Sequence, residues 1–170
     1  MVNHVPLDFP NRISIVHEWF SPSSSGGAEQ VVKAIDDLLC KRNIASDFFS
    51  LVDGESRDPE NWLFKRNVNT SFIQNLPLGV DKVQTFLPLL PFAIEQLDLR
   101  DYQIVISSNH LVAKGVLTSP EQLHVSYVHT PARYAWDQME TYLQHSSLAR
   151  MGLGPIIRWQ LHRFRQWDQL

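Results

Sequence analysis

Apolar residues along the chain follow two patterns, short continuous runs and longer stripes with helical spacing. Ile13–His17 is a run of mostly β-branched residues, which is typical of a strand buried on both faces of a sheet. From Ala28 to Leu39 the apolar residues recur every three or four positions, which predicts a helix with one buried face. Asp47–Val52, rich in Phe and Val, predicts the next strand. Strand, helix and strand within about 40 residues form a βαβ unit, whose crossover is right-handed.

The middle of the chain repeats the strand pattern. Further strands are predicted around Asn67–Thr70, at Tyr102–Ser107 and at Leu123–Val128, the last two as buried strands. Prolines between Leu76 and Leu99 predict short, kinked helices, because proline removes a backbone donor and disfavours helix before it.

The C-terminal part is predicted to be helical, from Arg133 onward and again over Ile156–Leu170. Alternating strands and helices with near-continuous apolar strands predict an α/β fold: a Rossmann-like, mostly parallel sheet with helices on both faces. The chain has 170 residues, the length of about one domain, so residues 1–170 are expected to form a single domain.

Composition narrows the function classes. Hydrophobic residues make up 44% of the chain and charged residues 19%, which excludes a disordered protein. The net charge of −3 gives no support for a nucleic-acid partner. Cys40 is the single cysteine; it is expected to pack rather than to react, and it fits a reducing compartment. No secretory leader and no run of about 20 apolar residues is found, so a cytoplasmic location is expected.

Three loops are candidate ligand sites, because ligands of an open parallel sheet bind beyond the carboxyl ends of its strands. The first loop follows His17 and contains Gly26 and Gly27, just before the predicted helix. Glycines let backbone amides approach a ligand, and a helix start offers free N–H groups to an anion such as phosphate. On motif strength alone a plain tight turn is favoured, since the loop is neither G-x-G-x-x-G nor a Walker A loop.

The second loop, Ser107–His110, follows a predicted strand, and Lys114 lies four residues further on. Hydroxyls, the Asn109 amide, an imidazole and an ammonium suit a polyhydroxylated or phosphorylated ligand. Alternatively, Ser108 or Asn109 caps a helix that begins near Leu111. Capping explains the small polar residues better than it explains His110 and Lys114.

The third loop begins with His129, at the end of a predicted strand, and contains Arg133. The imidazole could hydrogen-bond a sugar, and the guanidinium could meet an anion. A lone histidine is more often a core residue that the backbone satisfies. Because His17, His110 and His129 all fall in loops at strand ends, their positions favour a shared site.

Other motifs are absent or open to two interpretations. There is no H-E-x-x-H, no cysteine pair and no G-x-S-x-G, so neither a metal site nor a hydrolase triad is expected. The last helix combines basic residues with Trp159 and Trp167, a mixture that can lie at a membrane surface, including the inner face of a cell membrane. Packing on the sheet, with the arginines in water, is the favoured interpretation. The aromatic residues leave open an oligomer or another partner on this helix.

Five segments form a more specific pattern, in order along the chain. They are Ile13–Trp19, Gly26–Val32, Leu87–Gln96, Val105–Gly115 and Val128–Asp137. Together they resemble the N-terminal half of family 4 glycosyltransferases, also called group 1. The resemblance covers nearly all of residues 11–170 and is closest to bacterial enzymes of cell-surface polysaccharide biosynthesis.

Such enzymes have the GT-B architecture, with two Rossmann-like domains facing a cleft. They transfer a hexose from a nucleotide sugar to a glycan or lipid-linked acceptor, with retention and without a metal or other cofactor. The resemblance implies that this chain is the acceptor-side domain, that Gly26 and Gly27 bind the donor diphosphate, and that His129 is catalytic, at the sugar. The residues expected on the acceptor side are His17, Asn109, His110, Lys114 and Arg133.

The half of such enzymes that holds the nucleotide sugar, through a paired-glutamate E-x7-E motif, is absent from this sequence. Stabilising a departing diphosphate and excluding water need groups from both sides of the cleft. The chain alone is therefore expected to have little or no transferase activity. The alternative is a non-catalytic module that binds a glycan or an anion in the same place, or pairs through its last helix.

Overall fold

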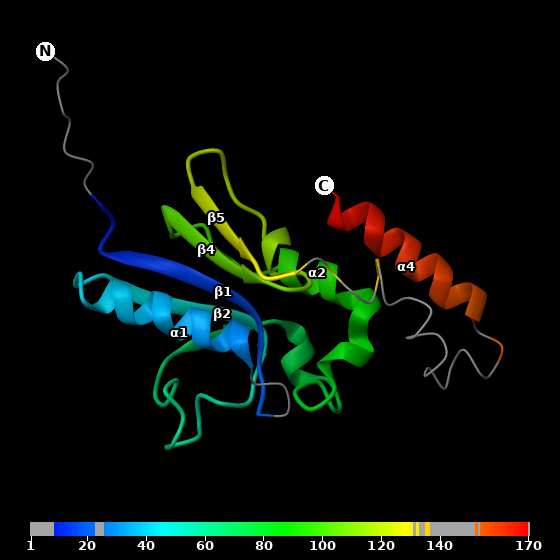
Figure 1. The fold of residues 1–170 in the computed structure, drawn as a ribbon, viewed down its shortest axis with the longest axis horizontal. Helices are drawn as coiled ribbons and strands as arrows, with labels where there is room; N and C mark the ends of the chain where they lie inside the picture. Colours follow the sequence, from blue (N-terminus) through cyan, green and yellow to red (C-terminus); the bar gives the residue numbers. More distant parts are fainter. Residues whose placement is uncertain are drawn as a thin grey trace, which may run out of the picture.

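The computed structural model describes residues 9–22, 26–130, 132, 135, 136, 152 and 154–169. Within these residues five strands form one sheet in the order β3-β2-β1-β4-β5, and every pairing is parallel (Figure 1). The strands are β1 (Arg12–Phe20), β2 (Ala45–Asp53), β3 (Val68–Thr70), β4 (Ile104–Asn109) and β5 (Leu123–Val128). The predicted α/β fold with a parallel, Rossmann-like sheet is confirmed.

Helices connect these strands, and the prolines make several of them short. The described helices are α1 (Gly27–Cys40), η1 (Phe72–Asn75), η2 (Val83–Leu89), α2 (Leu90–Glu95), η3 (Ala113–Gly115) and α4 (Gly154–Asp168). Pro88 lies inside η2 and Pro91 in the first turn of α2, so the short, kinked helices predicted for this region are confirmed. The helices predicted from Arg133 to residue 151 fall mostly outside the described residues.

Two apolar clusters cover the two faces of the sheet. Ile15 and Phe48 pack with Val32 of α1, whereas their chain neighbours Val16 and Phe49 belong to the cluster that includes α2 and α4. Consecutive residues of a strand point to opposite faces, so the helices lie on both sides of the sheet, as predicted.

The strand order places a topological switch between β1 and β4. From β1 the chain moves outward to β2 and β3, and it then returns to the other side of β1 to form β4 and β5. At such a reversal the loops on the two neighbouring strands leave in opposite directions, and a crevice opens beyond their carboxyl ends. This is where ligands bind in open α/β sheets.

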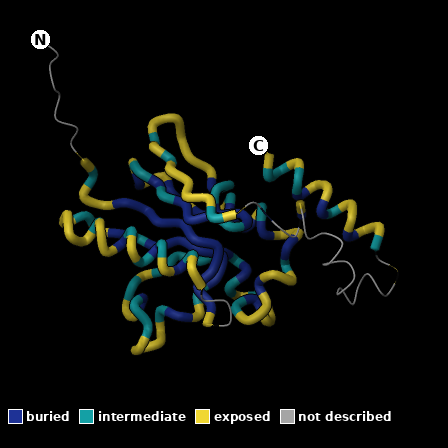
Figure 2. Tube along the Cα trace, in the orientation of Figure 1, coloured by how far each residue is buried: buried dark blue, intermediate teal, exposed yellow. Residues whose placement is uncertain are grey.

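The expectation that β5 is buried is wrong. Four of its apolar side chains are half exposed: Leu123 at 57%, Val125 at 47%, Tyr127 at 51% and Val128 at 52% (Figure 2). The strand lies at the edge of the sheet, and of the described strands only β4 pairs with it. A continuous apolar run indicates a strand made for burial, but it does not reveal what covers the strand.

Cys40 is exposed at the end of α1, so the expectation that it packs in the core is wrong. Its Sγ lies 3.8 Å from Asp36 Oδ1 and 3.8 Å from Arg66 Nη2. The helical stripe turns its apolar side toward the sheet and leaves position 40 on the outer side.

The last helix, α4, lies on the side of the sheet that carries α2, where it packs against α2, η2 and η3. Ile157, Leu161 and Phe164 are buried in the same cluster as α2. Trp167 fastens the C-terminal end, because its Nε1–H donates to Glu95 Oε1 of α2 at 2.6 Å.

Replacing Gly115 by alanine is expected to loosen α4. A Cβ at this position would lie 2.2 Å from Cζ2 of Trp167, whose ring Glu95 holds in place. We expect a loss of about 1–3 kcal/mol in the free energy of unfolding, measured by urea denaturation. Gly27→Ala is the matched control: its Cβ meets nothing within 4 Å, and it should leave stability unchanged or raise it by up to about 1 kcal/mol. Equal effects of the two substitutions would contradict the role of Trp167.

Candidate functional site

The three segments predicted as candidate sites meet at one edge of the sheet, but the prediction that His17 and Ser107–Asn109 lie in loops is wrong, because they belong to strands β1 and β4. His17 Nδ1 of β1 lies 3.2 Å from the carbonyl oxygen of Ser108 in β4, and Ser108 Oγ lies 2.9 Å from Nε2 of His129, just after β5. The rings of His17 and His110 are 5.9 Å apart. These contacts lie at the topological switch between β1 and β4, and they extend to the neighbouring end of β5.

Glu18 occupies the centre of this edge. Its side chain is fully buried, and Oε1 accepts hydrogen bonds from four consecutive backbone N–H groups, those of residues 110–113, at 2.8–3.1 Å. A concave run of N–H groups of this kind suits an anion, and here the protein fills it with its own carboxylate. Glu18 therefore fastens the loop after β4 to β1.

This clamp explains why no helix begins near Leu111. The first N–H groups after β4 point at Glu18 Oε1, and the chain forms only the three-residue turn η3 before it becomes extended at Val116. Asn109 does hold a backbone group, since its Oδ1 accepts the N–H of Lys114 at 2.9 Å. The residue acts as a local turn cap rather than as the start of a helix.

The second oxygen of Glu18 faces two histidines. Oε2 lies 2.9 Å from His110 Nδ1, within ion-pair distance, and 3.7 Å from His17 Nδ1. Burial by itself would raise the pKa of Glu18. The contact with His110, the positive charges of His110 and His17, and the N–H of Ala113 together lower it to about 2. Burial would lower the pKa of His110, yet Glu18 raises it above its usual value. The pair therefore favours a carboxylate beside an imidazolium.

Glu29 extends this network to the start of α1. Its Oε2 accepts the N–H of Gly26 at 2.7 Å, and its Oε1 lies 3.7 Å from His17 Nε2. Burial would raise the pKa of Glu29, but His17 and the N–H of Gly26 lower it. Acid and imidazole thus alternate from α1 to the loop after β4, in the order Glu29, His17, Glu18, His110.

The two glycines differ in what they offer a ligand. The N–H of Gly26 is engaged by Glu29, whereas the N–H of Gly27 makes no hydrogen bond with another described residue. Gly27 is exposed at the first position of α1, with open space where a side chain would stand. The N–H of Gly27 is therefore open to a ligand at this helix start.

The other predicted residues divide into accessible and buried ones. His110 and His129 are half buried, whereas His17 is 0% and Asn109 2% exposed. The two buried side chains hold neighbouring groups, so any effect they have on a ligand passes through those groups.

Lys114 turns away from the three histidines. Its Nζ donates to the carbonyl oxygen of Asp168 at 2.6 Å and lies 3.0 Å from Asp168 Oδ1, so its charge is paired with the end of α4. Arg133 lies outside the described residues.

The surroundings of His129 favour its uncharged form. Burial, together with the charges of His17 and His110, lowers its pKa. Its Nε2 pairs with Ser108 Oγ, and its Nδ1 makes no hydrogen bond with another described residue. A neutral imidazole with one open nitrogen can donate to or accept from a hydroxyl group.

A polar hollow of about 480 Å³ lies beside the start of α1. Glu29, Glu55, Asn61 and Trp62 contribute to its lining. Burial and the charges of Glu29 and Asp53 raise the pKa of Glu55. Carboxylates and an amide beside a tryptophan suit a ligand that presents both hydroxyl groups and an apolar ring face.

Sequence reasoning did not assign a role to Glu18 or Glu29, and it considered Ser108 only as a ligand hydroxyl or a helix cap. A signal was present for Glu18, because a charged residue within the apolar run of β1 can be buried only if it is paired. Ser108 and Glu29 gave no comparable signal, since both residue types are common at strand ends and in first helical turns.

Comparisons with known proteins identify no relative. No protein family, no curated protein and no solved structure matches the chain. Among the described residues, no three His, Cys, Asp or Glu side chains come together as ligands for a metal ion. None of the described helices has both the length and the apolar character needed to cross a membrane.

Proposed function

We propose that this chain is the acceptor-side domain of a retaining, metal-independent glycosyltransferase that moves a hexose from a nucleotide sugar to a glycan or lipid-linked acceptor. The proposal rests on one observation: candidate residues from distant segments of the sequence lie close together in the fold. Segments that resemble family 4 glycosyltransferases are far apart in the sequence, yet Gly27, His110 and His129 lie along one edge, at the switch between β1 and β4. That edge forms one wall of the cleft, and a second domain supplies the other.

In this proposal the start of α1 binds the donor diphosphate. The free N–H of Gly27 and the positive end of the helix dipole attract phosphate oxygens. They stabilise the negative charge that grows on the diphosphate as the sugar leaves. The hydrogen bond from Gly26 to Glu29 keeps the loop in the shape that exposes this N–H.

His129 acts at the sugar. Because its pKa is lowered, the imidazole is neutral and can hydrogen-bond a sugar hydroxyl through Nδ1, while Ser108 holds Nε2. His110 stands beside it as the accessible end of the acid–imidazole network, held by Glu18. Its imidazolium suits an acceptor that carries a phosphate or another anionic group.

A non-catalytic module that binds a glycan or an anion is the second candidate. The polar hollow beside α1 supports it, because this hollow is formed within the chain and needs no second domain. In this case the same loops recognise a sugar without transferring it.

Nuclear magnetic resonance on the isotope-labelled chain tests the diphosphate site. Uridine or guanosine diphosphate should shift the amide resonances of Gly27 and Ala28, and the nucleosides without phosphate should not. Gly27→Pro should abolish the shift of Ala28, because proline removes the N–H and fits the first helical position after the extended Gly26.

Gly27→Ala keeps the N–H and serves as the control, so it should respond like the natural chain. Binding that survives in Gly27→Pro would place the diphosphate elsewhere. Acceptor glycans that shift residues around the hollow, with no response to diphosphates, would favour the non-catalytic module.

A further inference from the structure

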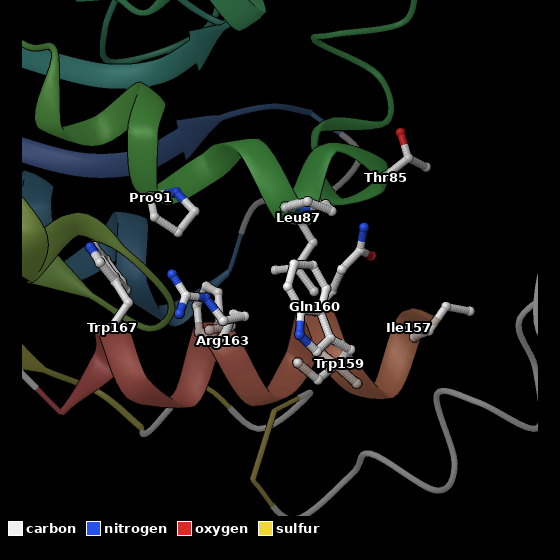
Figure 3. A pocket seen from close by; sticks show the side chains of 11 residues that line it. Thr85, Leu87, Pro91, Ile157, Trp159, Gln160, Arg163 and Trp167 are labelled. Atoms are coloured by element: carbon white, nitrogen blue, oxygen red, sulfur yellow. The ribbon is translucent and has the colours of Figure 1, made fainter. Parts of the chain in front are cut away.

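An apolar groove runs along α4, on the side where it faces η2 and α2 (Figure 3). Its volume is about 500 Å³, within the range of small-molecule sites. Leu87, Pro88 and Pro91 line one wall, and Trp159, Phe164 and Trp167 line the other. The proline rings carry no N–H, so this wall offers a ligand few hydrogen-bond donors.

Arg163 is the one cation among the described residues that line the groove. Arg163 points into the groove from α4, and it makes no hydrogen bond or ion pair with another described residue. Thr85 and Gln160 are the other polar residues of the lining. An unpaired guanidinium beside hydrocarbon walls favours a ligand with an anionic head and an apolar tail.

The surface of α4 next to the groove has the same character. Ile156 is 54% and Trp159 62% exposed, and with Arg163 they follow one side of the helix at spacings of three and four residues. The helix contains three arginines and one aspartate, whereas the whole chain has a net charge of −3. Positive charge, a tryptophan and an exposed isoleucine together are typical of a helix that lies at an anionic membrane surface.

We infer that α4 docks on membranes that contain anionic phospholipid, with one hydrocarbon chain of a lipid in the groove and its phosphate on Arg163. Ile157, Leu161 and Phe164 belong to the apolar cluster that includes α2 and also line the groove, so the lipid chain would lie against them. The groove is assigned to a lipid because Arg163 stands at its apolar walls, beside an exposed isoleucine and tryptophan on a helix with three arginines. The inference does not rest on sugar transfer, since the groove lies outside the network of Glu18 and His129.

Vesicle binding tests this docking. The chain should bind vesicles of phosphatidylcholine mixed with phosphatidylglycerol, and it should not bind phosphatidylcholine alone. Arg163→Gln should weaken binding about fivefold, the effect of one basic residue near the surface. Arg163→Lys should retain most of the binding, and Arg57→Gln, which removes an exposed charge from the loop between β2 and β3, should bind like the natural chain.

Quenching of tryptophan fluorescence tests whether a lipid acyl chain lies in the groove. Phosphatidylglycerol brominated on its acyl chains should quench tryptophan emission in the natural chain, and Trp159→Phe should remove much of that quenching. Equal binding to both kinds of vesicle, equal effects of Arg163→Gln and Arg57→Gln, or no quenching would overturn the inference. A dimer that forms without lipid and that Trp159→Ser disrupts would assign the groove to a second copy and would overturn it as well.

Discussion

Replacing Glu18 by alanine is expected to lower the free energy of unfolding by about 3–5 kcal/mol, the range for losing one member of a buried ionic cluster. Four backbone N–H groups would lose their common acceptor, and buried donors without partners are costly. His110 would also lose the carboxylate beside it. Urea denaturation at pH 7 measures the loss. Glu121→Gln, at an exposed glutamate, is the control and should have little effect.

The stability of the natural chain should depend on pH because of the same interaction between Glu18 and His110. The pKa of Glu18 lies at about 2 in the folded protein, against an ordinary value of 4.5, so its ionised form stabilises the fold. That contribution is complete above about pH 4.5 and is lost as the pH falls toward 2. The raised pKa of His110 works in the other direction, since its contribution is present below about pH 6.5 and is lost as the pH rises through the raised value.

The difference in stability between the natural chain and Glu18→Gln should therefore be largest from about pH 5 to pH 6.5. The glutamine keeps the shape of the side chain and can still accept from the loop, so this variant isolates the charge. A difference that stays constant from pH 2 to pH 8 would show that Glu18 acts through shape alone.

Replacing His129 by alanine should slow sugar transfer about 10²–10³-fold in an enzyme that joins this chain to a donor-binding domain. That is the usual effect of removing one polar group that stabilises a transition state. The measurement is the turnover rate at saturating acceptor. Stability should change little in comparison, because His129 is only half buried and has one side-chain hydrogen bond.

His124 provides a matched control for this experiment. It lies near the beginning of β5 and pairs with Ser107 Oγ at 2.8 Å, as His129 pairs with Ser108 Oγ at 2.9 Å. His124→Ala should leave turnover unchanged. Equal losses in the two variants would mean that His129 only supports the strand, and an active His129→Ala enzyme would reject its proposed role.

The sequence predicted the layers of the fold well because they depend on local patterns. The run at residues 123–128 and the stripe from Ala28 to Leu39 locate β5 and α1 almost to the residue. The exposure of β5 could not be predicted in the same way, because burial depends on which elements pack over a strand. Period and composition describe the strand itself but not its neighbours.

The candidate site was predicted in position but only partly in its contacts. The rule that ligands bind at strand ends brought Gly27, His110 and His129 to one edge. The clamp of Glu18 joins residues more than 90 positions apart in the sequence, so no local spacing could indicate it. For the same reason the pairing of Lys114 with Asp168 was not foreseen.

Among the described residues nothing pairs with the outer edge of β5, and this affects how the purified chain should be handled. β5 exposes two valines, a leucine and a tyrosine beside backbone groups that no described strand occupies on its outer side. A strand from another molecule can pair with an open edge of this kind, and such pairing leads to aggregation at high protein concentration. Storage at low concentration, or the substitution Val125→Lys, should prevent this aggregation. A charged side chain on an edge strand disfavours pairing with another strand.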